Sequence, residues 1–244
     1  TGGDDSSIVL DVLAGALRDM ATNLNNQLLN LQVIEYNDTI KPIITGAKID
    51  LNDNAKLVFY FSETVDLLSQ AKVDLNKLFL SNVTGEETVS LSASTITTEE
   101  YALSITVHLV ESARVKAIEN SNTPGGDNTG LLLFVKDGCI VDIAQNGQQF
   151  LQAMPINETA DIVLPKFVSS SIDYGTGVLI ITFSETIDAT PSSFVYLGNI
   201  YLSEDTSSNE VQLTGASVLP VDRLSITITL REDQRIDALV RSGT

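Results

Sequence analysis

Alternating hydrophobic and polar residues recur in short runs along the chain. Residues 57–61 and 179–183 place Leu, Ile or Phe at every second position. Residues 103–109 and 224–230 alternate in the same way, with Ser, Thr or His between the aliphatic side chains. A period of two buries one face of a β-strand, and Thr-rich outward faces fit a pleated surface. The pattern predicts an all-β fold.

One short helix is expected after each strand of the second pair. Hydrophobic side chains three residues apart favour a helix. The pairs are Val115 with Ile118, and Ile236 with Leu239. We expect Ser112 and Asp233 to be the N-caps, because their side-chain oxygens can accept hydrogen bonds from the first free backbone amides.

The strands belong to an internal repeat. Residues 15–23 (GALRDMATN) reappear as 138–146 (GCIVDIAQN), with an offset of 123. The offset is 122 for the Phe-Ser-Glu-Thr motif, at 61–64 and 183–186, and 121 for Arg114 against Arg235. A fixed period of this kind indicates a structural unit used more than once.

The repeat divides the chain into three blocks. Residues 1–38 correspond to the last strands of a repeat, and residues 39–161 to one complete unit of about 122 residues. Residues 162–244 correspond to the opening strands and helix of a second unit. The termini therefore fall in the middle of a repeat.

The two ends are complementary. Thr244 matches Thr123, and Thr1 matches Pro124, the next position. Each end alone lacks part of a core, and an unpaired strand edge is a template for another strand. We expect residues 1–38 of one copy to complete 162–244 of the next, as in donor-strand complementation. If the chain is a segment of a longer polypeptide, the same geometry arises covalently.

Composition excludes several functions. The formal net charge of −18 opposes binding to nucleic acid, and no apolar run approaches the roughly 20 residues that span a bilayer. Cys139 is the only cysteine, so no disulfide forms within the chain; its counterpart Ala16 predicts a small buried position. His108 is the only histidine, which leaves no standard zinc site. A Ser-His-Asp arrangement would have to use His108, and the repeat has Thr229 at that position. We expect no catalytic residues, no enzyme activity and no cofactor other than calcium.

Calcium is considered at one tight turn. The turn offers four oxygen-bearing side chains, from Asp50, Asn52, Asp53 and Asn54. The aligned segment 173–177 keeps only the first Asp. A hairpin turn of type I′ is the simpler explanation of the polar residues in both segments.

Other recurrent acidic and amide residues have a structural explanation. Asx side chains close turns by bonding to backbone amides, with a cation as the alternative; the pairs are Asp19 with Asn23 and Asp142 with Asn146. Carboxylates near the end of a buried strand are expected to accept backbone N–H bonds; they are Glu63, Glu185, Asp66 and Asp188. Asn-x-Ser/Thr sequons at Asn37, Asn82 and Asn157 are glycosylation sites only in a eukaryotic secreted protein.

The recurrent motifs resemble those of a known family. Phe-Ser-Glu-Thr followed by Val-Asp or Ile-Asp, at 61–66 and 183–188, is similar to the start of bacterial Ig-like repeats of surface-layer and large surface proteins. The later Asp-x-Ala-x-Asn, at 19–23 and 142–146, is similar to their end. The resemblance covers essentially the whole chain. It implies tandem Ig-like β-sandwiches on a cell surface that act as spacers, lattice elements or fibres without catalysis.

These observations favour a structural subunit or repeating segment of an extracellular filament, appendage or surface layer. Its partners are other copies of itself, assembled head to tail, or tandem repeats of a longer chain. The alternative is an adhesin or glycan-binding module of a surface protein, which would bind through loops at the ends of the sandwich.

Overall fold

The computed structural model describes residues 3, 6–69, 72–98, 100–204 and 210–243. Thr1, Gly2, Asp4 and Thr244, on which part of the repeat alignment rests, lie outside the described residues. The chain is mainly β, as predicted, and forms two compact units. Unit 1 comprises Thr1–Leu51 and Ala55–Thr159, and unit 2 comprises Asn52–Asn54 and Ala160–Thr244. The predicted division into three blocks stays a prediction.

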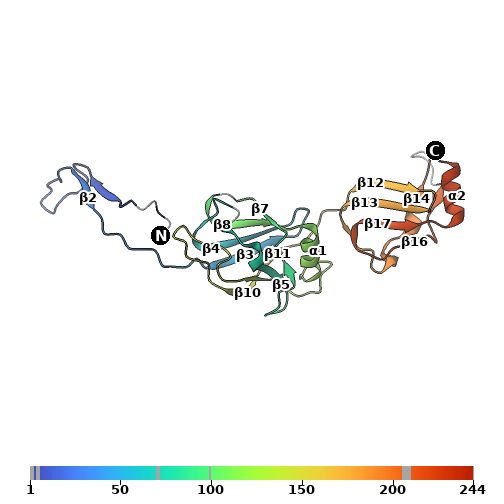
Figure 1. Cartoon of the computed structure of the whole chain (residues 1–244), viewed down its shortest axis with the longest axis horizontal. Coiled ribbons are helices and arrows are strands. Elements are labelled where there is room, and N and C mark those ends of the chain that lie inside the picture. Colours follow the sequence, from blue (N-terminus) through green and yellow to red (C-terminus); the bar gives the residue numbers. More distant parts are fainter. Residues whose placement is uncertain (1–2, 4–5, 70–71, 99, 205–209, 244) are drawn as a thin grey trace. The chain divides into compact units, whose positions relative to one another are not determined.

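Unit 1 contains two larger sheets (Figure 1). The first has the order β11-β3-β4-β8-β7, with β3 Ile44–Asp50, β4 Lys56–Asp66, β7 Thr95–Ile96, β8 Tyr101–His108 and β11 Asn157–Thr159. The second has the order β10-β9-β5-β6, with β5 Leu78–Ser81, β6 Val89–Ser90, β9 Leu132–Val135 and β10 Leu151–Pro155. The 3₁₀ turn η2 (Leu75–Lys77) precedes β5.

One hydrophobic core joins the two sheets. Leu57 and Phe59 of β4 and Val107 of β8 are fully buried, as their alternation predicted, and they share this core with Leu80 of β5 and Leu133 of β9. Because strands of both sheets contribute to one core, unit 1 is a two-layer β structure.

Leu103 departs from the predicted pattern, because it is exposed although it shares its period with Val107. The β4–β8 pairing is irregular between Tyr60 and Val65, opposite this part of β8.

The leading segment of unit 1 forms a separate two-stranded sheet. Strand β1 (Val9–Val12) pairs antiparallel with β2 (Leu28–Gln32), with Leu10 opposite Leu31. The long connection is closed by the Asp19–Asn23 turn, in which Asp19 Oδ1 accepts the amide of Asn23 at 2.8 Å. We call residues 8–35, which contain this sheet and its connection, the leading hairpin.

Unit 2 has one four-stranded and one two-stranded sheet. The order β12-β13-β17-β16 contains β12 Phe167–Asp173, β13 Val178–Ile187, β16 Ser217–Val218 and β17 Arg223–Thr229. The second sheet pairs β14 Tyr201–Leu202 with β15 Val211–Gln212. The 3₁₀ turns η3 (Ser192–Phe194) and η4 (Leu197–Asn199) precede β14. The core of unit 2 includes Leu179, Leu213, Ile226 and Ile228.

Each unit carries the predicted helix, α1 (Glu111–Glu119) or α2 (Glu232–Val240). The expected caps are wrong: the N-caps are Val110 and Arg231, so Ser112 and Asp233 lie inside the helices. In α1, Leu109 still bonds to the Ala55 carbonyl as the strand ladder ends, so the helix begins without a side-chain cap.

The buried helix face also differs from the predicted one. Arg114 is buried and donates from Nη1 to the Leu51 carbonyl at 3.2 Å, while its Nε donates to Glu111. At the aligned position, Arg235 donates to the Tyr174 carbonyl at 2.8 Å and to Glu232. These Arg contacts, rather than the hydrophobic pairs alone, orient the helices. Within the described residues, no helix has the length and apolarity needed to cross a membrane.

Candidate functional site

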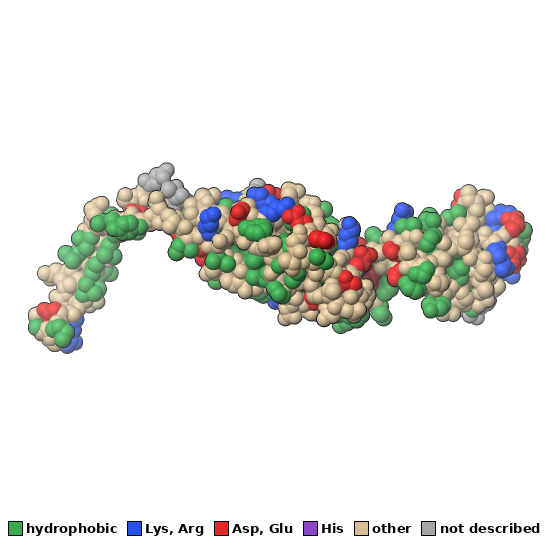
Figure 2. Space-filling view, turned by 90° about the horizontal axis from the view of Figure 1, so that it is seen from below, with side chains coloured by type: hydrophobic (Ala, Val, Ile, Leu, Met, Phe, Trp, Pro, Cys, Tyr) green, Lys and Arg blue, Asp and Glu red, His purple; other side chains and the backbone are tan. Residues whose placement is uncertain are grey.

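The leading hairpin exposes most of its large hydrophobic side chains. Ile8 is 61% exposed and Leu10 is 51% exposed. Figure 2 shows hydrophobic side chains gathered along the surface of this segment. The others that are exposed are Val9, Leu13, Leu17, Met20, Leu24, Leu28, Leu29 and Leu31. A surface this apolar is typical of an interaction site.

The aligned strands of unit 1 are buried in a core. β9 aligns with β1 at an offset of 123, and β10 aligns with β2. Leu131 and Leu133, the counterparts of Ile8 and Leu10, are 1% and 0% exposed. They owe this burial to the pairing of β9 with β5, in which Leu133 lies opposite Leu80 and Leu132 opposite Ser81. The strand pairs β1–β2 and β9–β10 have aligned sequences, but only β9–β10 is joined to further strands, through the pairing of β9 with β5.

Unit 2 presents the corresponding opening. The pair β14–β15 aligns with β5–β6 at an offset of 122. In unit 1 the sheet of β5 and β6 also contains β9 and β10, but the described part of unit 2 has no counterpart of these two strands. A pocket of about 260 Å³ lies beside β14. Its lining residues are Tyr174, Leu202, Ser203, Glu204, Val211, Ala238, Arg241 and Ser242.

The counterparts of these lining residues are covered in unit 1. Leu51, Leu80, Ser81, Ala117 and Ser121 align with five of them, and all five are 0% exposed. Leu51, Leu80 and Ala117 share one core with Leu131. The pocket in unit 2 is therefore lined by counterparts of residues that share a core with Leu131, the counterpart of Ile8.

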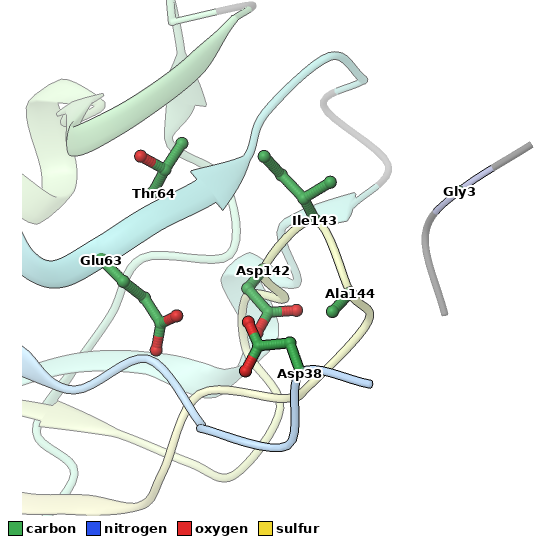
Figure 3. Close-up of a pocket in the computed structure, with 7 residues that line it drawn as sticks. All are labelled: Gly3, Asp38, Glu63, Thr64, Asp142, Ile143 and Ala144. Carbon is green, nitrogen blue, oxygen red and sulfur yellow. The ribbon is translucent and has the colours of Figure 1, made fainter. Parts of the chain in front are cut away.

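A second site is acidic. Asp38, Glu63 and Asp142 bring carboxylate oxygens within 4.8 Å of one another, the one such group of acidic, His or Cys side chains among the described residues. Figure 3 shows Glu63 from β4, Asp142 from the loop between β9 and β10, and Asp38 from the segment before β3 converging. They line a cavity of about 440 Å³ with Gly3, Thr64, Ile143 and Ala144.

The acidic site lacks donors at one carboxylate. Asp142 accepts the backbone and side-chain amides of Asn146, at 2.7 and 2.8 Å, so it closes a turn as predicted. Glu63 Oε1 is buried and has no hydrogen-bond partner within the described part of the chain. Burial, together with the charges of Asp38 and Asp142, raises the pKa of Glu63. Carboxylate oxygens of this type are those that hard cations bind.

The other recurrent carboxylates follow the expectation more closely. Asp66 accepts the amide of Leu68 at 3.2 Å, and Asp188 accepts the amide of Thr190 at 3.1 Å. The expectation of backbone donors is wrong for Glu63, because its neighbours at this position are the acceptors Asp38 and Asp142.

The tight turn differs from the predicted type. The loop between β3 and β4 has five residues, and Asn54 alone within it has a positive φ, of 58°. A type I′ turn needs two such residues, so that assignment is wrong. Asp50 is exposed, Asp53 is half-buried, and Asn52 Oδ1 accepts the amide of Ile162 at 2.9 Å. Calcium at Asp50, Asn52, Asp53 and Asn54 stays a prediction.

The sequons differ in their surroundings. Asn37 and Asn157 are exposed. Asn82 donates from Nδ2 to Asp127 and, at 2.8 Å, to Thr129. Attachment of a sugar to Asn82 Nδ2 would leave a single N–H and so remove at least one of these bonds, whereas Asn37 and Asn157 are exposed.

The only cysteine and the only histidine both lie in unit 1. Cys139 is fully buried, as predicted, and burial raises the pKa of its thiol to about 12. His108 lies half-buried on β8, with Nε2 3.3 Å from the Thr97 hydroxyl.

Two sets of contacts in unit 1, made by Glu158 and Gly126, were not predicted from the sequence. Glu158 Oε1 accepts the amide of Leu131 at 2.5 Å, and Oε2 accepts the amide of Asn122 at 2.9 Å. Gly126 packs directly against carbonyls at the end of α1. The signal was available, because Glu35 and Gly3 recur at the same offset of 123.

A scan of the sequence against known protein-family models gives no match, and a search of curated protein sequences gives none either.

Proposed function

We propose that this protein is a structural subunit of an extracellular filament or surface layer, built by head-to-tail completion of a split β-sandwich. The leading hairpin of one copy adds strands to unit 2 of the next, as strand-addition complexes do. The observation that carries the proposal is the contrast between buried Leu131 and Leu133 and their exposed counterparts Ile8 and Leu10.

Burial of the hairpin supplies the driving force. Moving a Leu or Ile side chain from water into a core stabilises by about 1.5–3 kcal/mol, and the hairpin exposes several such side chains. Their combined burial offsets the loss of translational and rotational freedom, about 4–15 kcal/mol. Donor and acceptor are different segments of one chain, so a contact between copies propagates unless rotation closes a ring.

The repeat motifs support the same role. The resemblance of Phe-Ser-Glu-Thr and Asp-x-Ala-x-Asn to bacterial Ig-like surface repeats favours a place on the cell surface. The net charge of −18 suits a hydrated exterior polymer and argues against nucleic-acid partners.

A rearranged chain tests the proposal. It carries residues 39–244 followed by 1–38, so that both units are complete within one molecule. Electron microscopy of the concentrated wild-type chain should reveal filaments, and the rearranged chain should stay monomeric and melt at a higher temperature. Wild-type chains that remain single particles at high concentration would refute the proposal.

A further inference from the structure

The Glu158 carboxylate connects three segments of unit 1 through hydrogen bonds. It lies on β11, which pairs in parallel with β3. One carboxylate oxygen accepts the amide of Leu131 at the start of β9, and the other accepts the amide of Asn122 after α1. Hydrogen bonds to a charged acceptor are the strong ones, so Glu158 fixes how β9 and β11 meet the end of the helix.

The leading hairpin contains the counterpart of one of these two hydrogen bonds. Glu35, the counterpart of Glu158, accepts the amide of Ile8, the counterpart of Leu131, at 2.9 Å. The counterpart of Asn122 is Gly243, which follows α2 in unit 2. The amide of Gly243 has no hydrogen bond within the described part of the chain. The donor of the second bond therefore lies on the open unit.

A close approach in unit 1 marks the same place. A Cβ atom at Gly126 would lie 2.1 Å from the Ser121 carbonyl oxygen and 2.6 Å from that of Ile118. The backbone of Gly126 is not left-handed, so the close approach, rather than φ, requires glycine. Gly3, its counterpart, has nothing within 4 Å of such a Cβ.

The end of α2 has the geometry that receives this glycine. Ser121 Oγ donates to the Ile118 carbonyl at 2.8 Å. Ser242 Oγ donates to the Leu239 carbonyl at the same 2.8 Å. The carbonyls that crowd Gly126 in unit 1 thus have equivalents on α2, and Leu239 is exposed beside them.

We infer that a second copy of this chain docks on unit 2 in one register, fixed at two points by its Gly3 and Glu35. Gly3 packs on the carbonyls of Leu239 and Ser242. The carboxylate of Glu35 joins its own Ile8 amide to the Gly243 amide of the neighbouring copy. In this register Val9 lies opposite Ser203 of that copy. The inference rests on the proposed function and names the residues that set its specificity.

Substitution of glycine separates docking from folding. Gly3→Ala should leave the melting temperature of the dilute monomer unchanged, because the added Cβ would have no atom within 4 Å there. It should raise the concentration needed for assembly at least about tenfold, since the added methyl overpacks the contact. Ser7→Ala is the control; its counterpart Gly130 has only Glu158 Oε1, at 3.9 Å, near the added Cβ. Gly126→Ala should instead lower the melting temperature of the monomer.

Glu35→Gln tests the second point. The amide retains one acceptor oxygen and loses the charge, so one of the two backbone donors lacks a partner. We expect assembly to weaken about tenfold, with the dilute monomer melting as the wild type does. Assembly of Gly3→Ala and Glu35→Gln at the wild-type concentration would overturn the inference.

Cysteine pairs test the register directly. Under mild oxidation, Val9→Cys/Ser203→Cys should give a denaturing-gel ladder in steps of 26.2 kDa, because opposite residues of paired strands lie within disulfide range. Val9→Cys/Tyr201→Cys, two residues out of register, should give far less. Wild-type assembly with equal cross-linking of both pairs would overturn the register alone, whereas failure of the wild type to assemble would refute the proposed function.

Discussion

Leu10 and Leu133 provide a matched pair in which one substitution has two different consequences. Leu133 is 0% exposed and belongs to the core of unit 1. Truncation of such a Leu to Ala costs about 2–5 kcal/mol. Leu10 is 51% exposed, so Leu10→Ala should change the free energy of unfolding of the monomer by only a few tenths of a kcal/mol, roughly the scale of surface substitutions.

Assembly should reverse this order. In the docked hairpin Leu10 takes the environment of Leu133, so its truncation removes at least about 2 kcal/mol from association. That free energy corresponds to about a 30-fold rise in the concentration needed for assembly. Thermal melting of the dilute chain measures the first effect, and light scattering against concentration measures the second.

Two results would refute this reasoning. One is that Leu10→Ala melts as early as Leu133→Ala, which would mean that Leu10 is already buried in its own molecule. Alternatively, the variant would assemble at the wild-type concentration, which would mean that the hairpin does not enter a core.

Three further predictions concern the ionisable groups. Burial raises the pKa of Glu63 in the fold, so the destabilising contribution of this one carboxylate should disappear as pH falls through that pKa. Glu63→Gln should therefore raise the melting temperature at pH 7 and not in acid, and equal melting of the two chains at pH 7 would contradict this. The thiol of Cys139, with its pKa raised to about 12, should react with a thiol reagent at pH 8 only on unfolding, and rapid labelling of the folded chain would disprove its burial. Calcium at the tight turn should raise the melting temperature of the wild type and not of Asp53→Asn. Identical melting of the wild type in calcium and in EDTA would contradict a calcium site at this turn.

Periodicity in the sequence located the strands well. Residues 57–61 and 226–230 alternate because one face of each strand packs on a core, and Phe59, Ile226 and Ile228 are buried, whereas Leu224 is exposed. Leu103 escaped the pattern because strand alternation assumes a regular ladder, and the β4–β8 pairing is irregular there.

Contacts between distant segments were harder to predict. The bond from Arg114 to the Leu51 carbonyl joins residues 63 apart, and neither side chain spacing nor propensity encodes it. The helix caps failed for a related reason, because Val110 continues directly from a strand whose last bond holds the chain in place. The repeat marked the arginine without its partner: Arg114 recurs as Arg235, and Arg235 makes the aligned contact with the Tyr174 carbonyl.

The mass of the wild-type chain in solution tests the central claim most directly. Sedimentation velocity over a wide range of concentrations should give species that grow in steps of 26.2 kDa, while the rearranged chain stays at one step. A wild-type chain that sediments at 26.2 kDa at every concentration would contradict head-to-tail completion of unit 2 by the leading hairpin.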